Sequence, residues 1–238
     1  MDLIQALAAE LGKDPRHVEN VVRLLDEGNT IPFIARYRKE LHGAMDDTSL
    51  RTLEERLQYL RGLEERREAV KKSIDEQGKL TDELAAAIDS AKTLAEVEDL
   101  YRPYKQKRRT RATMAKEKGL EPLAALLFAQ ERDCPRPEEA ARDFVDPEKG
   151  VETVEDALQG ASDIIAEQIS DDAAIRKSLR ALISRQGQLV SRAAAEDDSV
   201  YRLYYDFTQS VARLQGHQVL AVNRGEKEGF LKAGIELD

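Results

Sequence analysis

The amino-acid sequence predicts a mainly α protein: an elongated multi-helix domain with a helix-turn-helix-like N-terminus, a long central helix and a C-terminal β-hairpin. The first observation is compositional, because Glu, Lys, Arg, Ala and Leu, which favour helices, dominate the long middle stretches. The second is that apolar residues recur at helical spacing along most of the 238 residues. The third is that apolar residues alternate, as in a strand, only near the end.

The first 45 residues predict three short helices joined by tight turns. Gly12 is expected to end the first helix, and Asp14 is expected to cap the second. Gly28 is expected to end the second helix, and Thr30 to precede the third. Such a unit is either a DNA-reading helix-turn-helix or a plain three-helix packing unit, and the sequence leaves both open.

A long helix is expected over residues 48–78. Its apolar residues step by three and four: Leu50, Leu53, Leu57 and Leu60. At about 1.5 Å per residue, a helix of nearly thirty residues spans roughly 40 Å. Two i,i+4 ion pairs are expected on its outward face, Arg61–Glu65 and Glu68–Lys72. We interpret this helix as a scaffold.

Shorter helices are expected to follow. Thr81 and Thr93 stand where N-caps are favoured, and they predict two short helices before Tyr101. Apolar stripes through residues 154–165 and 175–182 predict two further helices.

The last twenty residues predict the β-hairpin. Its strands are expected at residues 219–222 and 231–237, with a turn at "NRGE" between them. A lone hairpin is marginal in water, and its edge strand needs a partner. We therefore expect the chain to be the N-terminal part of a longer protein. A covering contact from the helical body is the alternative.

Several classes of function are not supported by the residues. The three histidines, His17, His42 and His217, lack Cys or His at metal-ligand spacing. No phosphate-binding loop, dinucleotide-binding loop or hydrolase serine motif occurs, and Cys134 has no base nearby. Clustered carboxylates of the nuclease type are also missing. We therefore predict no enzyme activity, cofactor or metal. No apolar run reaches the roughly 18 residues of a membrane helix, so no membrane contact is expected.

Residues 101–118 form the basic segment, a stretch with eight Lys or Arg and a single acid, Glu117. It carries a charge of +7, which leaves −16 on the other 220 residues of a chain whose net charge is −9. A local cluster of cations attracts phosphate, whereas the acidic remainder repels it. The candidate nucleic-acid-binding residues are Arg102, Lys105, Lys107, Arg108, Arg109, Arg111, Lys116 and Lys118.

The conformation of the basic segment is also predicted. Pro103 disfavours helical angles at Arg102, so the segment is expected to begin extended and to turn helical from about Ala112. Tyr101 and Tyr104 are placed to stack on bases. The competing interpretation is a surface loop whose arginines pair with acidic helices, as an intramolecular clamp, or bind another protein.

Several stretches together resemble the N-terminal half of the bacterial Tex family of transcription accessory proteins. They are "NTIPFIARYRKEL", "LRTLEERLQYLRGLEERREAV", "SIDEQGKLTDELAAAI", "DLYRPYKQKRRTRATMAKEKGLEPLA" and "VLAVNRGEKEGFLK". The similarity extends across nearly the full chain. Two segments depart from the family pattern, "HGAMDD" in place of a "TGGLDD"-like turn and "RLQGHQ" in place of a "RLPSHR"-like segment.

The resemblance implies a cytoplasmic, mostly helical protein. It implies a Tex-type N-terminal helical domain over residues 1–195 and the start of the central region over residues 196–238. An RNase H-like domain, a helix-hairpin-helix element and an RNA-binding OB-fold are expected beyond this chain. The resemblance transfers no catalytic residue.

We therefore predict a non-enzymatic helical scaffold of a transcription accessory protein. It would bind nucleic acid, RNA ahead of DNA, mainly through domains absent from this chain, and it is expected to be a monomer. The alternative is a protein-interaction module that docks on the transcription or translation machinery. Its contacts would be the acidic helix faces and the aromatic stretch from Tyr201 to Phe207.

Overall fold

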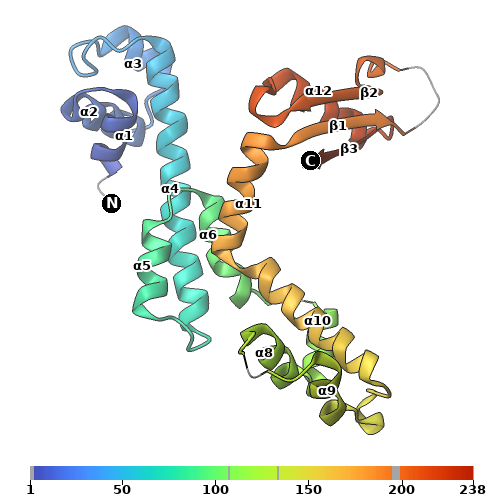
Figure 1. The fold of residues 1–238 in the computed structure, drawn as a ribbon. Helices are drawn as coiled ribbons and strands as arrows, with labels where there is room; N and C mark the ends of the chain where they lie inside the picture. The colour runs from blue at the N-terminus through green and yellow to red at the C-terminus, as the bar shows by residue number, and fades with distance from the viewer. Residues whose placement is uncertain (1–2, 107, 133, 195–198, 238) are drawn as a thin grey trace. The chain divides into compact units, whose positions relative to one another are not determined.

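The computed structural model describes residues 3–106, 108–132, 134–194 and 199–237 (Figure 1). The described chain is mainly helical, with a small antiparallel sheet near the C-terminus, which confirms the predicted class. It divides into two compact units, which we call the first unit, up to Tyr101, and the second unit, from Arg102 onward. The domain boundary expected at residue 195 lies inside the second unit and stays a prediction.

The first unit begins with three short helices packed against the first half of a long one. Their bounds are α1 (Leu3–Leu11), α2 (Pro15–Asp26), α3 (Ile31–Tyr37) and α4 (Asp47–Asp75). The Asp14 carboxylate accepts a hydrogen bond from the backbone N–H of Arg16 at 2.8 Å, which confirms the predicted cap. Buried apolar side chains from all four helices form one core. The helix-turn-helix-like character of residues 1–45 stays a prediction.

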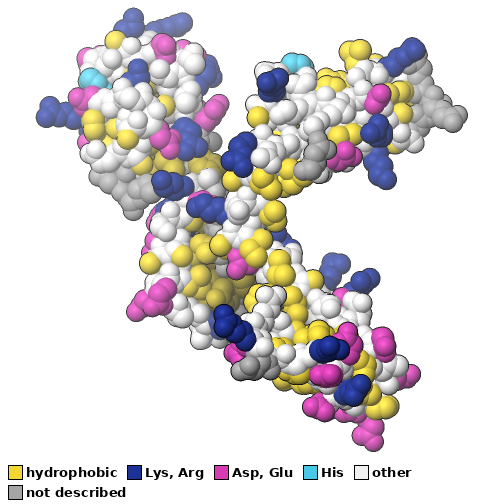
Figure 2. Space-filling view, viewed as in Figure 1, with side chains coloured by type: hydrophobic (Ala, Val, Ile, Leu, Met, Phe, Trp, Pro, Cys, Tyr) yellow, Lys and Arg dark blue, Asp and Glu magenta, His cyan; other side chains and the backbone are white. Residues whose placement is uncertain are grey.

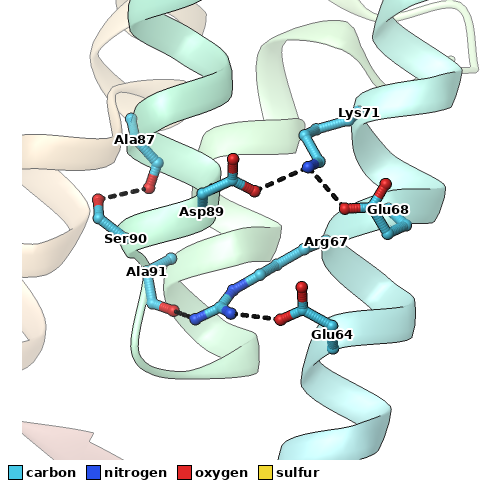
Figure 3. Close-up of polar contacts among 8 residues, drawn as sticks. All are labelled: Glu64, Arg67, Glu68, Lys71, Ala87, Asp89, Ser90 and Ala91. Carbon is cyan, nitrogen blue, oxygen red and sulfur yellow. Dashed lines mark hydrogen bonds and ion pairs between the residues drawn. The ribbon is translucent and has the colours of Figure 1, made fainter. Parts of the chain in front are cut away.

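The second half of α4 packs against α5 (Asp82–Ser90) and α6 (Leu94–Tyr101). Figure 3 shows how charged side chains reinforce the contact with α5: Arg67 donates to Glu64 and to the backbone carbonyl of Ala91, and Lys71 donates to Glu68 and Asp89. Only 3% of Arg67 is exposed, so its guanidinium is a buried charge that these acceptors compensate.

The prediction of two i,i+4 ion pairs along α4, Arg61–Glu65 and Glu68–Lys72, is wrong. Arg61 pairs with Asp26 of α2 at 2.7 Å, and Glu68 pairs with Lys71 at 2.6 Å. Because α2 packs against α4, the Asp26 carboxylate accepts two hydrogen bonds from the Arg61 guanidinium. A flexible side chain one turn away on the same helix does not match this paired geometry. For Arg61, contact with another helix therefore overrides the i,i+4 spacing, whereas Glu68 pairs one residue nearer along α4.

Helices make up the first part of the second unit. Their bounds are η1 (Arg102–Tyr104), α7 (Arg111–Glu117), α8 (Glu121–Ala129), α9 (Pro137–Ala141), η2 (Arg142–Phe144), η3 (Pro147–Lys149), α10 (Val154–Asp171) and α11 (Ala173–Gln186). The helix α10 is the central helix of this part, and α7, α8 and α9 pack against it. Small side chains let α7 approach α10 closely: Ala112, Ala115, Ala157 and Ala161 are all buried in this core.

A three-stranded antiparallel sheet lies in the rest of the second unit. Its strands are β1 (Gln188–Ala193), β2 (Asp206–Ser210) and β3 (Leu231–Glu236), in the spatial order β2-β1-β3. Ser191 at the centre of β1 pairs with Phe207 on one side and with Ala233 on the other. The remaining elements are η4 (Arg202–Tyr204), η5 (Val211–Arg213) and α12 (Gly216–Lys227).

The predicted hairpin is wrong in its first strand and in its turn, because residues 219–222 and the "NRGE" segment at 223–226 both lie inside α12. Four consecutive apolar residues carry no periodicity, so helix and strand could not be told apart there. Contact with β3 decides the matter: Val222 and Gly225 are the buried residues of α12, and a Cβ on Gly225 would lie 2.5 Å from Leu231 Cδ1. The strand expected at residues 231–237 is confirmed, and its partner is β1.

Candidate nucleic-acid interface

The basic segment starts the second unit. The helix α6 ends at Tyr101, as expected, but Arg102 does not begin an extended stretch. Residues 102–104 form the 3₁₀ turn η1, because proline is tolerated in the first turn of a helix, where its missing N–H is not needed. Residues 105, 106 and 108–110 have no helix or strand, and Lys107 lies outside the described residues.

The helix α7 ends the basic segment and holds it against the core. Thr110 caps this helix by accepting the backbone N–H of Thr113 at 3.0 Å. The helix starts at Arg111, one residue before the predicted start, and it buries Ala112 and Ala115 against α10. Gly119 turns the chain after it at φ 83°, as predicted.

A groove of about 620 Å³ lies between the basic segment and α10. One wall is basic: Arg102, Lys105, Arg108, Arg109 and Arg111. The other wall belongs to α10 and is acidic through Asp163, Glu167 and Asp171, with Ser170 between the last two. On the face seen in Figure 2, Lys and Arg side chains over α8–α10 are interspersed with Asp and Glu, so the cations do not form a broad basic surface there.

Two ion pairs hold the basic wall. Arg102 donates from Nε to Oδ1 of Asp171 at 2.8 Å, and only 11% of the Asp171 side chain is exposed. Arg109 donates to Glu117 at 2.7 Å, with 69% and 54% of the two side chains exposed. Ion pairs in water contribute little, whereas a shielded pair is held more firmly. The Arg102–Asp171 pair is therefore the firmer anchor.

Of the eight predicted contact residues, Lys107 lies outside the described residues, and the other seven fall into two groups. Five line the groove, whereas Lys116 and Lys118 do not: Lys116 pairs with Glu121 at 3.3 Å, and Lys118 donates to the backbone carbonyl of Gly150 at 2.8 Å. In the described part of the chain, Lys105, Arg108 and Arg111 are exposed and form no ion pair. These three cations are therefore available to a ligand.

The sequence analysis considered acidic helices as partners of the arginines but did not identify the residues of the acidic wall, although a signal for them was present. Asp163, Glu167 and Asp171 recur every four residues, which places them on one face of a helix. The aromatic prediction also changes for Tyr101, whose hydroxyl lies 3.0 Å from that of Ser73 within the first unit, under the Arg66 guanidinium. Tyr104 is half-buried in the basic segment.

Neither a metal cluster nor a membrane span occurs in the described ranges. They contain no group of three or more His, Cys, Asp and Glu side chains arranged to hold a metal ion. They also contain no helix both long and apolar enough to span a bilayer.

The sequence matches two family models, the Tex-like protein N-terminal domain over residues 1–75 and the Tex central region-like model over residues 133–238. It is similar to YdcI of Bacillus subtilis, with 48% identity over 238 residues, covering 98% of this chain and 33% of that protein. The transcriptional accessory protein Tex of Neisseria gonorrhoeae is 42% identical over 240 residues, covering 99% and 31%. The S1 RNA-binding domain-containing protein 1 of Homo sapiens is 30% identical over 247 residues, covering 99% and 24%.

The similarity to these relatives covers nearly all of this chain but a third or less of each of them. The N-terminal model lies within the first unit and the central-region model lies within the second unit, and neither of these two models covers residues 76–132. The chain therefore belongs to the Tex family and corresponds to its N-terminal and central-region segments.

Proposed function

We propose that this chain is a non-enzymatic helical scaffold of a transcription accessory protein, with an auxiliary nucleic-acid contact in the basic segment. The observation that carries the proposal is the groove, where Lys105, Arg108 and Arg111 are exposed on a segment anchored at both ends. Because relatives are named for transcription and for RNA binding, RNA is the first nucleic acid to test, ahead of DNA. The longer protein would bind it mainly outside this chain, in the cytoplasm.

The contact would be made with phosphate groups. Lys and Arg side chains bind phosphates largely irrespective of base sequence, and each contact releases condensed counterions. Three cations on a single strand should therefore give a slope of log affinity against log salt of about −2. The acidic wall limits the affinity, which is why we assign an auxiliary contact and not the principal one.

The proposal that the chain is non-enzymatic rests on how its charged groups are used. The acids of the groove include Asp171, which is engaged with Arg102. No nucleophile with an adjacent base was identified in the sequence, and Ser170 and Thr110 are the hydroxyl side chains among the described residues that line the groove. An activity that copurified with the chain and vanished on substitution of a single groove acid would contradict this proposal.

The proposed contact can be tested with a labelled single-stranded RNA of twelve nucleotides and fluorescence anisotropy at several salt concentrations. The variant replaces Lys105, Arg108 and Arg111 with Ala. The matched control removes three exposed lysines of the first unit, Lys72, Lys79 and Lys92, and so changes the net charge equally. We expect at least tenfold weaker binding and a shallower slope for the first variant alone. Equal losses in both, or a loss in neither, would exclude a specific contact.

A second candidate function is docking on a protein of the transcription or translation machinery. Val200, which directly precedes the aromatic stretch from Tyr201 to Phe207, is 87% exposed, and Leu203 within that stretch is 86% exposed. Exposed apolar side chains beside aromatic ones are the kind of surface that a partner protein can cover. Co-sedimentation with purified bacterial RNA polymerase, and separately with ribosomes, tests this role. Serine at both positions should abolish binding, and unchanged binding would remove the argument.

A further inference from the structure

We infer that Asp171 is the positioning residue of the groove: its ion pair with Arg102 holds the start of the basic segment so that Lys105, Arg108 and Arg111 present their charges together. This inference rests on the proposed function, since it concerns the same groove. It gives a carboxylate the role of positioning the cations that would bind phosphate. The argument begins with the unusual setting of Asp171.

Asp171 occupies a place where a carboxylate is otherwise unfavourable. It is the last residue of α10, where the helix dipole disfavours negative charge, and the residue as a whole is 8% exposed. A buried carboxylate is costly without a charged partner, and Arg102 supplies one at 2.8 Å. The next residue, Asp172, is the one that caps α11, by accepting the backbone N–H of Ile175 at 2.8 Å. Helix capping therefore explains Asp172 and not Asp171.

The ion pair is connected directly to the exposed cations. Arg102 opens η1, and its carbonyl accepts the backbone N–H of Lys105 at 3.4 Å. Pro103 restricts the backbone between them. The orientation of Arg102 therefore determines where the chain leaves η1 and where Lys105 lies. At the other end, the Thr110 cap and the packing of α7 on α10 hold the segment.

Positioning and simple electrostatics predict opposite results for one substitution. Asp171→Asn removes a negative charge from the groove, so long-range electrostatics alone predicts tighter binding of phosphate. If Asp171 positions the segment, the same change removes the ion pair with Arg102 and weakens binding. Asp163 is the matched control, because it lines the same wall, is half-buried and accepts a hydrogen bond from the Gln159 amide at 3.1 Å. Asp163→Asn changes the charge equally and leaves the ion pair intact.

The experiment measures binding of the same twelve-nucleotide RNA to the whole chain. We expect Asp163→Asn to bind as tightly as the wild type or up to about threefold more tightly. We expect Asp171→Asn to bind about five- to tenfold more weakly, with a salt slope shallower by about 0.7 for each phosphate that the variant no longer binds. Asp171→Glu, which keeps the charge, should restore part of the affinity. Tighter binding by Asp171→Asn would overturn the inference.

A second readout follows the position of the segment without any ligand. Limited trypsin digestion, mapped by mass spectrometry, should cut faster after Lys105, Arg108 and Arg109 in Asp171→Asn and at the wild-type rate in Asp163→Asn. Equal digestion of the two variants would contradict the inference. If the wild type binds no RNA, the proposed function fails, while the digestion still decides whether Asp171 anchors the segment.

A further variant covers the case in which Asp171→Asn does not fold. Arg102→Lys keeps both charges and the net charge of the chain but loses the Nε donor that bonds Asp171. We expect it to fold and to bind RNA about two- to threefold more weakly, because only geometry has changed. Wild-type affinity and wild-type digestion in this variant would overturn the inference.

Discussion

Replacement of Gly160 by Ala tests the packing that holds the acidic wall in place. Gly160 lies within α10, where α7 and α8 pack. A Cβ at this position would lie 2.3 Å from Leu120 Cδ1 and 3.3 Å from the Cβ of Ala115. Leu120 is 1% exposed, so its side chain cannot move aside without displacing the core.

Two opposing effects determine the magnitude. Ala favours a helix interior over Gly by about 1 kcal/mol, which would stabilise α10. Inserting a methyl group into a close-packed core typically costs about 1–3 kcal/mol, and a 2.3 Å approach lies in the severe part of that range. We therefore expect Gly160→Ala to lower the free energy of unfolding of the second unit by about 1–2 kcal/mol.

Gly62 provides the matched control. It also lies within a helix, α4, but an added Cβ would meet nothing within 4 Å. Gly62→Ala should therefore raise the stability of the first unit by about 1 kcal/mol. Native-state hydrogen exchange measures each unit separately, through the amides of α10 for one variant and of α4 for the other.

A double variant makes the reasoning refutable. Leu120→Ala removes the side chain that Gly160→Ala would contact, so adding Gly160→Ala to that background should stabilise the protein and not destabilise it. The sign of the Gly160→Ala effect should thus reverse between the two backgrounds. If Gly160→Ala stabilises the wild type as Gly62→Ala does, then α7, α8 and α10 do not pack as closely around Gly160 as described.

Three further predictions concern other parts of the chain. The Arg61 guanidinium lowers the pKa of Asp26 below its ordinary value of 3.8. The pair therefore stabilises the fold above that pH, and its contribution is lost as the pH falls through the lowered pKa. The free energies of urea unfolding of Arg61→Gln and of the wild type should become equal below the lowered pKa. His42 is 1% exposed, and neither ring nitrogen has a hydrogen-bond partner among the described residues, so His42→Leu should raise stability by about 1 kcal/mol in the same assay. The Glu226 carboxylate accepts the backbone N–H of Ala233 on the open edge of β3, so Glu226→Ala should promote self-association in analytical ultracentrifugation.

Each of these has a result that would count against it. A constant difference between Arg61→Gln and wild type from pH 5 to pH 2.5 would show that the Asp26 charge is not involved. A loss of stability in His42→Leu would indicate that the imidazole makes a contact that the structure does not show. A strictly monomeric Glu226→Ala would mean that the edge of β3 needs no protection.

The start and end of most helices could be predicted because the signals are local. Thr81 accepts the backbone N–H of Leu84 at 3.2 Å, as its position before the helix indicated. Gly12 and Gly28 adopt positive φ, which glycine reaches at little cost, and they end the helices that were expected to end there. Such contacts span only a few residues, so the sequence contains the information they need.

The C-terminal sheet could be predicted only in part because its pairing is not local. The strand β1 pairs with β3 across some forty intervening residues, and it pairs with β2 across a shorter connection. The alternation in residues 231–237 is a local property and was visible, whereas the partner strand was not. The helix that contains Val222 packs on β3, where Leu231 lies against Gly225, and a short apolar run does not reveal this contact.

The candidate site also has features that the sequence shows and features that depend on tertiary contacts. Sequence alone determined that a basic segment interrupts an acidic chain, that Tyr101 and Gly119 bound it, and that the residues resemble the Tex family. Only the tertiary structure decided which cations are available to a ligand. Arg102 donates to Asp171, which is sixty-nine residues away in the chain, and Lys118 donates to the backbone carbonyl of Gly150. Charge and helix boundaries depend on neighbours in the chain, whereas the pairing of charges depends on which helix faces are packed together.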